Sequence, residues 1–152
     1  MSAPSTPTIH ASAVLVGARA VLIRGPAGAG KSRLALALLS AAQTGQLGFA
    51  RLVADDRVLI EPMHGRLLAR PAPALAGLLE VRGLGVRRIP HEPVAVVGTV
   101  LDLAATDAKR LPEKISRQTE IAGIFLPRLA VAASAEPLPL LLCHLQSMDA
   151  ID

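Results

Sequence analysis

The alternation of hydrophobic and polar positions divides the N-terminal part of the chain into strands and one helix. Residues 9–16 and 19–24 are short runs of apolar and small side chains around a glycine turn, and they predict a β-hairpin. Residues 31–42 carry apolar side chains at helical spacing, which predicts an amphipathic helix. Residues 49–56 predict another apolar strand. Strands interleaved with a helix in this order indicate the α/β class.

The remainder of the chain is predicted to contain mainly strands. Residues 57–70 form a second expected hairpin around a Pro-Met-His-Gly turn. A nearly continuous apolar run at 93–103 is typical of a strand that is buried on both faces. The polar stretch 104–118 predicts a loop or a short helix. Three further elements close the chain: edge strands at 120–125 and 128–133, separated by Pro127, and a terminal helix over 138–151 that begins at Pro137 or Pro139.

A phosphate-binding motif lies between the strand at 19–24 and the helix at 31–42. Its sequence, GPAGAGKS, fits the pattern G-x-x-x-x-G-K-[ST] in the strand and helix context that the motif requires. Glycines allow backbone N–H groups to turn toward a phosphate, and the helix dipole adds positive potential there. Lys31 is expected to reach the β- and γ-phosphates, and the Ser32 hydroxyl to bind Mg²⁺. The predicted nucleotide-binding residues are Gly25, Pro26, Ala27, Gly28, Ala29, Gly30, Lys31 and Ser32.

Carboxylates follow the predicted strands at positions where an α/β sheet places functional groups. Asp55 and Asp56 end the strand at 49–56, and this location favours a role in chemistry over the opening of a simple turn. Asp102 ends the buried strand in the same way and could organise Mg²⁺ in an ordinary P-loop enzyme. The stretch 79–86 combines Glu80 with an arginine and two glycines, which suggests close backbone approach or a mobile active-site loop.

Composition narrows the class of protein and of ligand. The 152 residues suit one domain, and 51% of them are hydrophobic although Trp and Tyr are absent. Without aromatic stacking platforms, the chain is not expected to bind single-stranded nucleic acid. The net charge of +4 suits an anionic ligand such as a nucleotide but is too small to indicate DNA binding. The single cysteine, Cys143, is predicted to be a buried thiol in a reducing compartment.

No part of the sequence indicates a membrane segment or a secretory signal. No stretch approaches the ~18–20 continuous apolar residues that a membrane span needs. Residues 1–8 lack a basic region and are expected to be a flexible leader, followed by one domain at 9–152. The expected location is the cytoplasm.

Four stretches together carry a family resemblance. They are Ile9-His10-Ala11, the phosphate-binding motif, LVADDRV at 52–58 and LEVRGLGV at 79–86, of which the last two are the more specific. Over about residues 9–131 the chain resembles the C-terminal catalytic domain of HPr kinase/phosphorylase, without the N-terminal domain of the long members. The resemblance implies a P-loop nucleotide-binding domain with a mixed central sheet and hairpins, like the nucleotide fold of phosphoenolpyruvate carboxykinase.

The resemblance also implies an activity, which is ATP-dependent phosphorylation of a serine in the phosphocarrier HPr or an HPr-like protein. ATP and Mg²⁺ are the implied cofactors, the regulation of a phosphotransferase system is the implied role, and a hexamer is the implied assembly. Asp56 corresponds to the base of the kinase reaction and the acid of its reverse, while Ser32 and Glu80 correspond to the Mg²⁺ ligands. The residues implied to be catalytic are His10, Lys31, Asp55, Asp56 and Arg110.

The chain departs from the family pattern in one segment, and two alternative functions stay open. Long members carry a Pro-Val-Arg-Pro-Gly-Arg-like segment linked to dephosphorylation, whereas residues 131–137 here contain neither arginine nor glycine. The kinase reaction is therefore the primary expectation, and phosphorolysis of seryl-phosphate is secondary. The alternatives are a small-molecule P-loop kinase in which Asp102 replaces Asp55 and Asp56 as the metal organiser, and a nucleotide-sensing regulator without turnover.

Overall fold

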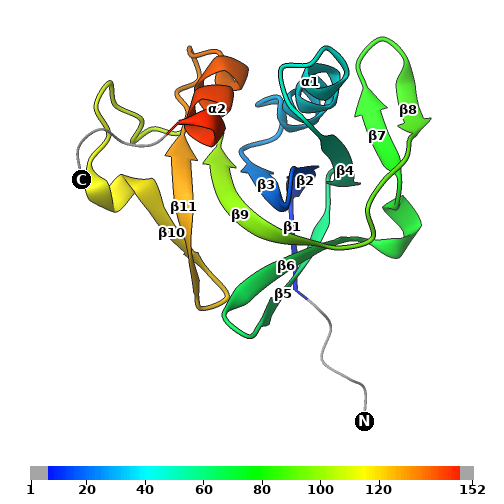
Figure 1. The fold of residues 1–152 in the computed structure, drawn as a ribbon, viewed down its shortest axis with the longest axis horizontal. Coiled ribbons are helices and arrows are strands. Elements are labelled where there is room, and N and C mark those ends of the chain that lie inside the picture. Colours follow the sequence, from blue (N-terminus) through cyan, green and yellow to red (C-terminus); the bar gives the residue numbers. More distant parts are fainter. Residues whose placement is uncertain (1–6, 148–152) are drawn as a thin grey trace.

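The computed structural model describes residues 7–147, which form one large β-sheet, a separate two-stranded hairpin and two α-helices (Figure 1). The strands are β1 (Thr8–Ile9), β2 (Ala11–Val16), β3 (Arg19–Arg24), β4 (Ala50–Ala54), β5 (Val58–Met63), β6 (Arg66–Pro71), β7 (Leu78–Val81), β8 (Gly85–Arg88), β9 (Ala95–Asp102), β10 (Gln118–Ile121) and β11 (Ile124–Ala130). The helices are α1 (Lys31–Gln43) and α2 (Pro137–Gln146), with short 3₁₀ turns η1 (Pro73–Leu75) and η2 (Lys114–Arg117).

The large sheet is mixed and curled. Its strands lie in the order β1-β5-β6-β9-β3-β2-β4, while β11 pairs with β9 and with β10. The β3–β9 and β9–β11 pairs are parallel, and the other pairs of this sheet are antiparallel. Strand β9 curves so that its start pairs with β6 and its end lies between β3 and β11 (Figure 1). The mixed central sheet expected from the sequence is therefore confirmed, with hairpins at β2–β3 and β5–β6.

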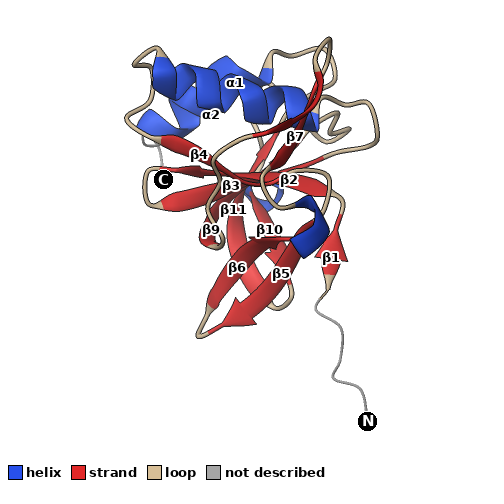
Figure 2. Ribbon diagram, turned by 90° about the vertical axis from the view of Figure 1, so that its right-hand side faces the viewer, coloured by secondary structure: helices blue, strands red, loops and turns tan. Residues whose placement is uncertain are grey.

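Apolar side chains are buried on both faces of the central strands. In β3, Val21 and Ile23 belong to the core cluster under the helices, whereas Leu22 belongs to the cluster on the opposite face. Figure 2 shows both helices on one side of the sheet. The predicted apolar face of α1 is confirmed, since Leu34 and Leu38 are buried in the helix-side core. This arrangement holds the start of α1 against the ends of β3 and β4.

The predicted boundary between the last two strands was wrong. The turn lies at Ala122 and Gly123, whose φ angles of 51° and 81° are both left-handed, as a tight hairpin turn requires. Pro127 lies inside β11, opposite Gln118 of β10. The proline is tolerated because pairing of β11 with β9 begins only at the next residue, Arg128, so that no ladder hydrogen bond to β9 depends on the missing N–H group.

The stretch 79–86 lies within a β-hairpin. Strands β7 and β8 pair antiparallel and are separate from the large sheet. Gly83 and Gly85 have φ angles of 94° and 91°, and a Cβ atom on either would meet nothing within 4 Å. Both glycines therefore allow the left-handed turn between the two strands, and within residues 7–147 no atom lies close enough to exclude a Cβ atom at either.

The ends of the described chain modify three predictions. Helix α2 begins at Pro137 as expected and ends at Gln146, while residues 148–152 lie outside the described part. Cys143 is exposed on α2, so the prediction of a buried thiol was wrong. Thr8, the last residue of the expected leader, already pairs with Leu59, and residues 1–6 are not described. Within residues 7–147, no helix is both long and apolar enough to cross a membrane.

Candidate functional site

The Gly25–Ser32 loop joins β3 to α1 in a conformation that depends on its glycines. A Cβ atom on Gly25 would lie 3.0 Å from the Cβ atom of Leu103, so only glycine fits without displacement. Gly30 caps the N-terminus of α1 with a φ angle of 103°, a left-handed value that favours glycine. The Lys31 ammonium donates hydrogen bonds to the carbonyl oxygens of Gly25, at 2.7 Å, and Pro26, at 3.2 Å. The lysine thus lies along the loop with its charge inside the loop's curve.

Asp55 is a buried carboxylate that connects three separate elements. It follows the last residue of β4 and is only 5% exposed. The Ser32 hydroxyl lies 2.8 and 2.9 Å from its two oxygens, and the Ser12 hydroxyl donates to Oδ1 at 2.6 Å. The backbone N–H of Glu80 donates to Oδ2 at 3.2 Å. Asp55 therefore links the end of the Gly25–Ser32 loop to β2 and to β7.

Asp56 and His10 lie on the exposed side of the same strand ends. Asp56 has a φ angle of 72° and an exposed side chain, so the chain turns sharply between the buried and the exposed aspartate. The Ala11 N–H donates to the Asp56 carbonyl at 3.3 Å, which places the bend at His10 beside Asp56 in space. Neither the His10 nor the Asp56 side chain has a hydrogen bond or ion pair within residues 7–147. Both side chains are exposed and available to a ligand.

The donor set around Asp55 fits a magnesium ion that is bound together with phosphates. Among the described residues, no group of three or more His, Cys, Asp or Glu side chains could hold a metal alone. Mg²⁺ usually binds through one or two carboxylates plus substrate phosphates, and a serine hydroxyl beside one carboxylate matches that pattern. Of the two predicted ligands, Ser32 is bonded to Asp55 through its hydroxyl and Glu80 through its backbone N–H.

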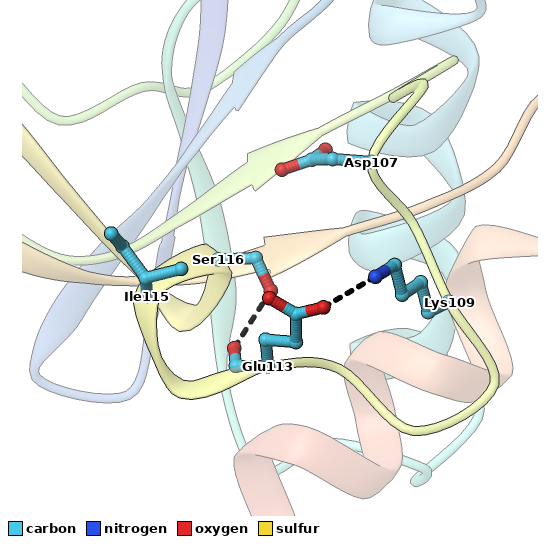
Figure 3. Close-up of a pocket in the computed structure, with 5 residues that line it drawn as sticks. All are labelled: Asp107, Lys109, Glu113, Ile115 and Ser116. Atoms are coloured by element: carbon cyan, nitrogen blue, oxygen red, sulfur yellow. Dashed lines mark hydrogen bonds and ion pairs between the residues drawn. The ribbon is translucent and has the colours of Figure 1, made fainter.

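Arg110 lies in the exposed loop between β9 and η2, and the structure does not bring it into contact with Asp55 or the Gly25–Ser32 loop. Its neighbours form a pocket of about 240 Å³ (Figure 3). In this pocket, the exposed side chains of Lys109 and Glu113 form an ion pair. The full lining is Asp107, Lys109, Glu113, Ile115 and Ser116. None of these residues comes from the Gly25–Ser32 loop, so this pocket is distinct from the phosphate motif.

A network of ion pairs at the ends of β3, β9 and β11 was not predicted. Arg24 donates to both oxygens of Asp102, at 2.7 and 2.8 Å, and Arg128 donates to Asp102 at 2.6 Å. Arg128 also pairs with Asp107 at 2.8 and 3.0 Å and donates to the Ser116 carbonyl at 2.9 Å. Arg24 and Asp102 each end an apolar run, and these opposite charges at strand ends are the sequence signal that could have indicated an ion pair. Both carboxylate oxygens of Asp102 therefore accept hydrogen bonds from arginines.

The charges of this network change the acidity of its members. Partial burial alone would raise the pKa of Asp102, but hydrogen bonds from Arg24 and Arg128, together with their positive charges, lower that pKa below 3.8. The hydrogen bond from Arg128 likewise lowers the pKa of Asp107, and the two carboxylates raise the pKa of Arg128. All three groups are thus charged across the neutral range and bind the loop at 104–117 to the central strands.

Asp102→Asn is expected to reduce the free energy of unfolding at pH 7 by about 2–3 kcal/mol, because it removes the charge from hydrogen bonds to two arginines. The depressed pKa of Asp102 makes this contribution complete above the unfolded value of 3.8, and it is lost as the pH falls toward the lower folded value. Urea denaturation of both proteins between pH 7 and pH 3 would measure the difference.

Glu113→Gln provides the control, because the Lys109–Glu113 pair is more than half exposed on both sides. An exposed pair of this kind is expected to change the free energy of unfolding by less than about 0.5 kcal/mol. A difference between wild type and Asp102→Asn that stays constant or grows below pH 3.8 would contradict the assigned role of the ionised Asp102 carboxylate.

Comparisons with known proteins agree with this architecture. Residues 3–92 match the family described as the HPr Serine kinase C-terminal domain. HPr kinase/phosphorylase of Clostridium tetani is 40% identical over 101 residues, which cover 66% of this chain and 30% of that protein. HPr kinase/phosphorylase of Geobacillus thermodenitrificans is 34% identical over 143 residues, covering 85% of this chain and 43% of that protein. The chain therefore spans less than half the length of these relatives.

A solved structure, the Hpr(Ser) kinase/phosphatase from Coxiella burnetii, has the same fold. It superimposes with a TM-score of 0.71 at 23% sequence identity, covering 91% of this chain and 86% of that one. The fold and site thus define a mixed α/β protein with a curled central sheet and a glycine-rich loop between β3 and α1. Within that class, the chain belongs to the HPr serine kinase C-terminal domain family, because the family model matches more than half of it.

Proposed function

We propose that this protein is an ATP-dependent kinase that phosphorylates a serine of HPr or an HPr-like phosphocarrier. The observation that carries the proposal is the buried Asp55, which holds Ser32 of the Gly25–Ser32 loop and the backbone of Glu80 at one point. Relatives in the same family are named HPr kinase/phosphorylase. The fold is proposed to be a P-loop nucleotide domain of the phosphoenolpyruvate carboxykinase type.

Nucleotide binding is assigned to the Gly25–Ser32 loop. Its glycines allow backbone N–H groups to face the phosphates, and the N-terminus of α1 adds positive potential. The Lys31 ammonium already lies within the loop, bonded to the Gly25 and Pro26 carbonyls. When ATP binds, Lys31 must exchange its hydrogen bonds to these carbonyls for hydrogen bonds to phosphate oxygens. The new bonds are stronger because the phosphate acceptor is charged.

The metal site is assigned to the Ser32 hydroxyl and the Glu80 carboxylate. When bound, Mg²⁺ supplies charge neutralisation for the phosphate oxygens. The Ser32 hydroxyl donates its hydrogen bond to the Asp55 carboxylate, so the lone pairs of the serine oxygen stay free for the cation. Glu80 lies exposed on β7, and its backbone N–H donates to the same carboxylate. Asp55 thus orients the Ser32 hydroxyl directly and fixes the backbone of Glu80 beside it.

Removal of the proton from the hydroxyl of the acceptor serine is assigned to Asp56. Its side chain is exposed at the end of β4, whereas the neighbouring Asp55 is buried and fully engaged, so Asp56 is the carboxylate that an incoming hydroxyl can reach. A positioned carboxylate that accepts this proton acts as a general base. His10 precedes Ala11, whose N–H donates to the Asp56 carbonyl, and it is proposed to contact the transferred group. Arg110 is proposed to approach the site from the loop after β9.

The cellular setting is proposed from the family resemblance. The protein is expected in the cytoplasm, in a homo-oligomer that is a hexamer by resemblance, and to act in the regulation of a phosphotransferase system. It is not expected to bind nucleic acid or membranes. The reverse reaction, phosphorolysis of seryl-phosphate, is secondary because the segment 131–137 lacks the arginine and glycine of the long members.

The contacts of Asp102 argue against the alternative of a small-molecule kinase. That alternative needs Asp102 as the metal organiser, but this carboxylate is bound by Arg24 and Arg128. A cation at Asp102 would have to displace two charge-assisted interactions and face two positive charges. Among residues 7–147, no arginine or lysine pairs with the Glu80 carboxylate, and the Ser32 hydroxyl is bonded to Asp55.

Acceptor-dependent turnover tests the proposal. The purified protein is incubated with ATP and Mg²⁺, with and without an HPr-like protein, and ADP formation is followed. ADP formation that rises and saturates with the acceptor concentration supports a protein kinase. ADP formation that is independent of the acceptor would indicate a small-molecule kinase or an ATPase. Nucleotide binding without any ADP formation would indicate a regulator.

A further inference from the structure

Ser12 is a buried polar residue in an otherwise apolar strand segment. It lies in β2 and is 1% exposed, and the residues on either side, Ala11 and Ala13, are fully buried. A hydroxyl group at such a position destabilises the fold unless it has a hydrogen-bond partner. The cross-strand neighbour of Ser12 is the apolar Ile23, so the partner is not on β3.

The partner of Ser12 is the carboxylate at the centre of the candidate site. Its hydroxyl donates to Oδ1 of Asp55 at 2.6 Å, across 43 positions of sequence. The Glu80 N–H approaches the other oxygen, Oδ2, at 3.2 Å. These two donors act on opposite oxygens and therefore fix the rotation of the carboxylate about its Cβ–Cγ bond. The Ser32 hydroxyl then meets both oxygens in a defined orientation.

We propose that Ser12 is a positioning residue for the divalent-cation site, acting through Asp55 on the Ser32 hydroxyl. The inference rests on the proposed function, because it assigns the Ser32 oxygen as a ligand of the cation. Ser12 does not touch the cation or the substrate. It holds the carboxylate that orients the ligand, in the way that outer-shell hydrogen bonds orient the ligands of other metal sites.

Ser12→Ala removes the donor to Oδ1 and leaves the rest of β2 unchanged. The Asp55 carboxylate can then rotate away from the orientation that its three donors define, and the Ser32 hydroxyl loses its fixed direction. Loss of such an outer-shell hydrogen bond typically weakens metal affinity by about 10–100-fold. Nucleotide bound without metal depends on the loop amides and Lys31, which Ser12 does not contact, so its affinity is expected to remain unchanged.

Manganese binding in the presence of a non-hydrolysable ATP analogue provides the measurement. Mn²⁺ is followed by electron paramagnetic resonance, and analogue binding in the presence of EDTA by calorimetry, in wild type, Ser12→Ala and Ser12→Thr. The expected result for Ser12→Ala is Mn²⁺ affinity about 10-fold weaker, with metal-free nucleotide affinity unchanged. Ser12→Thr keeps the hydroxyl and is expected to restore most of the Mn²⁺ affinity. Ser12→Cys, a weaker donor, replaces Ser12→Ala if the latter does not fold.

Two results would overturn the inference. Equal Mn²⁺ affinity in wild type and Ser12→Ala would show that the hydroxyl only satisfies its own burial. Equal losses of metal-free and metal-dependent nucleotide binding would show a general structural defect. Both measurements are independent of phosphoryl transfer, so a protein that binds Mn²⁺ as described but does not phosphorylate an acceptor would contradict the proposed kinase activity and leave the role of Ser12 intact.

Discussion

Asp56→Ala is expected to lower the rate of phosphoryl transfer by about 10²- to 10⁴-fold, the range for loss of a general base. Nucleotide affinity is expected to stay near the wild-type value, because the Asp56 side chain is exposed and forms no hydrogen bond or ion pair within residues 7–147. The buried neighbour Asp55 has its hydrogen bonds from Ser12 and Ser32 and is not available as a substitute. Single-turnover transfer and calorimetric titration of the ATP analogue measure the two effects.

Glu61→Ala is the matched control for this variant. Glu61 is a partly exposed carboxylate on β5 whose partner is Arg70, at 3.7 Å, and it belongs to no part of the candidate site. Its removal is expected to leave both transfer and nucleotide affinity unchanged. Loss of nucleotide binding in Asp56→Ala would instead assign Asp56 to the metal site and contradict its role as the base.

Lys31→Ala is expected to weaken ATP binding by about 10- to 100-fold, because the lysine supplies a charge-assisted hydrogen bond to the phosphates. Transfer is expected to fall as well, since Lys31 is assigned to the β- and γ-phosphates, between which the bond breaks. The affinity can be measured by calorimetry with the ATP analogue and Mg²⁺.

Lys109→Ala is the control for the loss of a lysine. Lys109 is exposed, pairs with Glu113 beside the pocket of Figure 3, and does not contact the Gly25–Ser32 loop. It is expected to bind ATP as wild type does. An unchanged affinity in Lys31→Ala would mean that the nucleotide binds elsewhere, and it would remove the basis of the proposed function.

Local sequence predicts the strand–loop–helix arrangement around residues 25–32 well, because the glycine-rich motif specifies its own backbone. Glycines, the preceding apolar strand and the following amphipathic helix are adjacent in the chain, so β3, the loop and α1 follow from short-range rules. The two-sided burial of β9 was also predictable, since its apolar run has no polar face. The roles assigned to His10 and Arg110 from the resemblance remain predictions.

Long-range contacts could not be predicted in the same way. Ser12 and Asp55 meet because β2 pairs with β4, and no local sequence pattern predicts that pairing. The bonds of Asp102 depend on the parallel alignment of β9 with β3, which brings Arg24 to the same sheet edge. From the sequence alone, Asp102 therefore appears as an aspartate without a partner at a strand end, which is a position where a metal ligand is expected.

The wrong prediction of the turn between β10 and β11 has a different cause. Proline usually interrupts a strand, so the sequence alone predicts the break at Pro127. The actual break uses Ala122 and Gly123, and alanine is not a residue that normally marks a left-handed turn. Pro127 is accepted where β11 changes partner from β10 to β9, and such a change of partner is a property of the whole sheet.

The central claim is that the phosphoryl group of ATP is transferred to a serine of a protein. Its most direct test is mass spectrometry of an HPr-like protein after incubation with this protein, ATP and Mg²⁺, followed by peptide mapping of the modified residue. The predicted result is one phosphoserine per acceptor, formed by wild type and lost in Asp56→Ala. An unmodified acceptor in a reaction that nevertheless consumes ATP would contradict the claim.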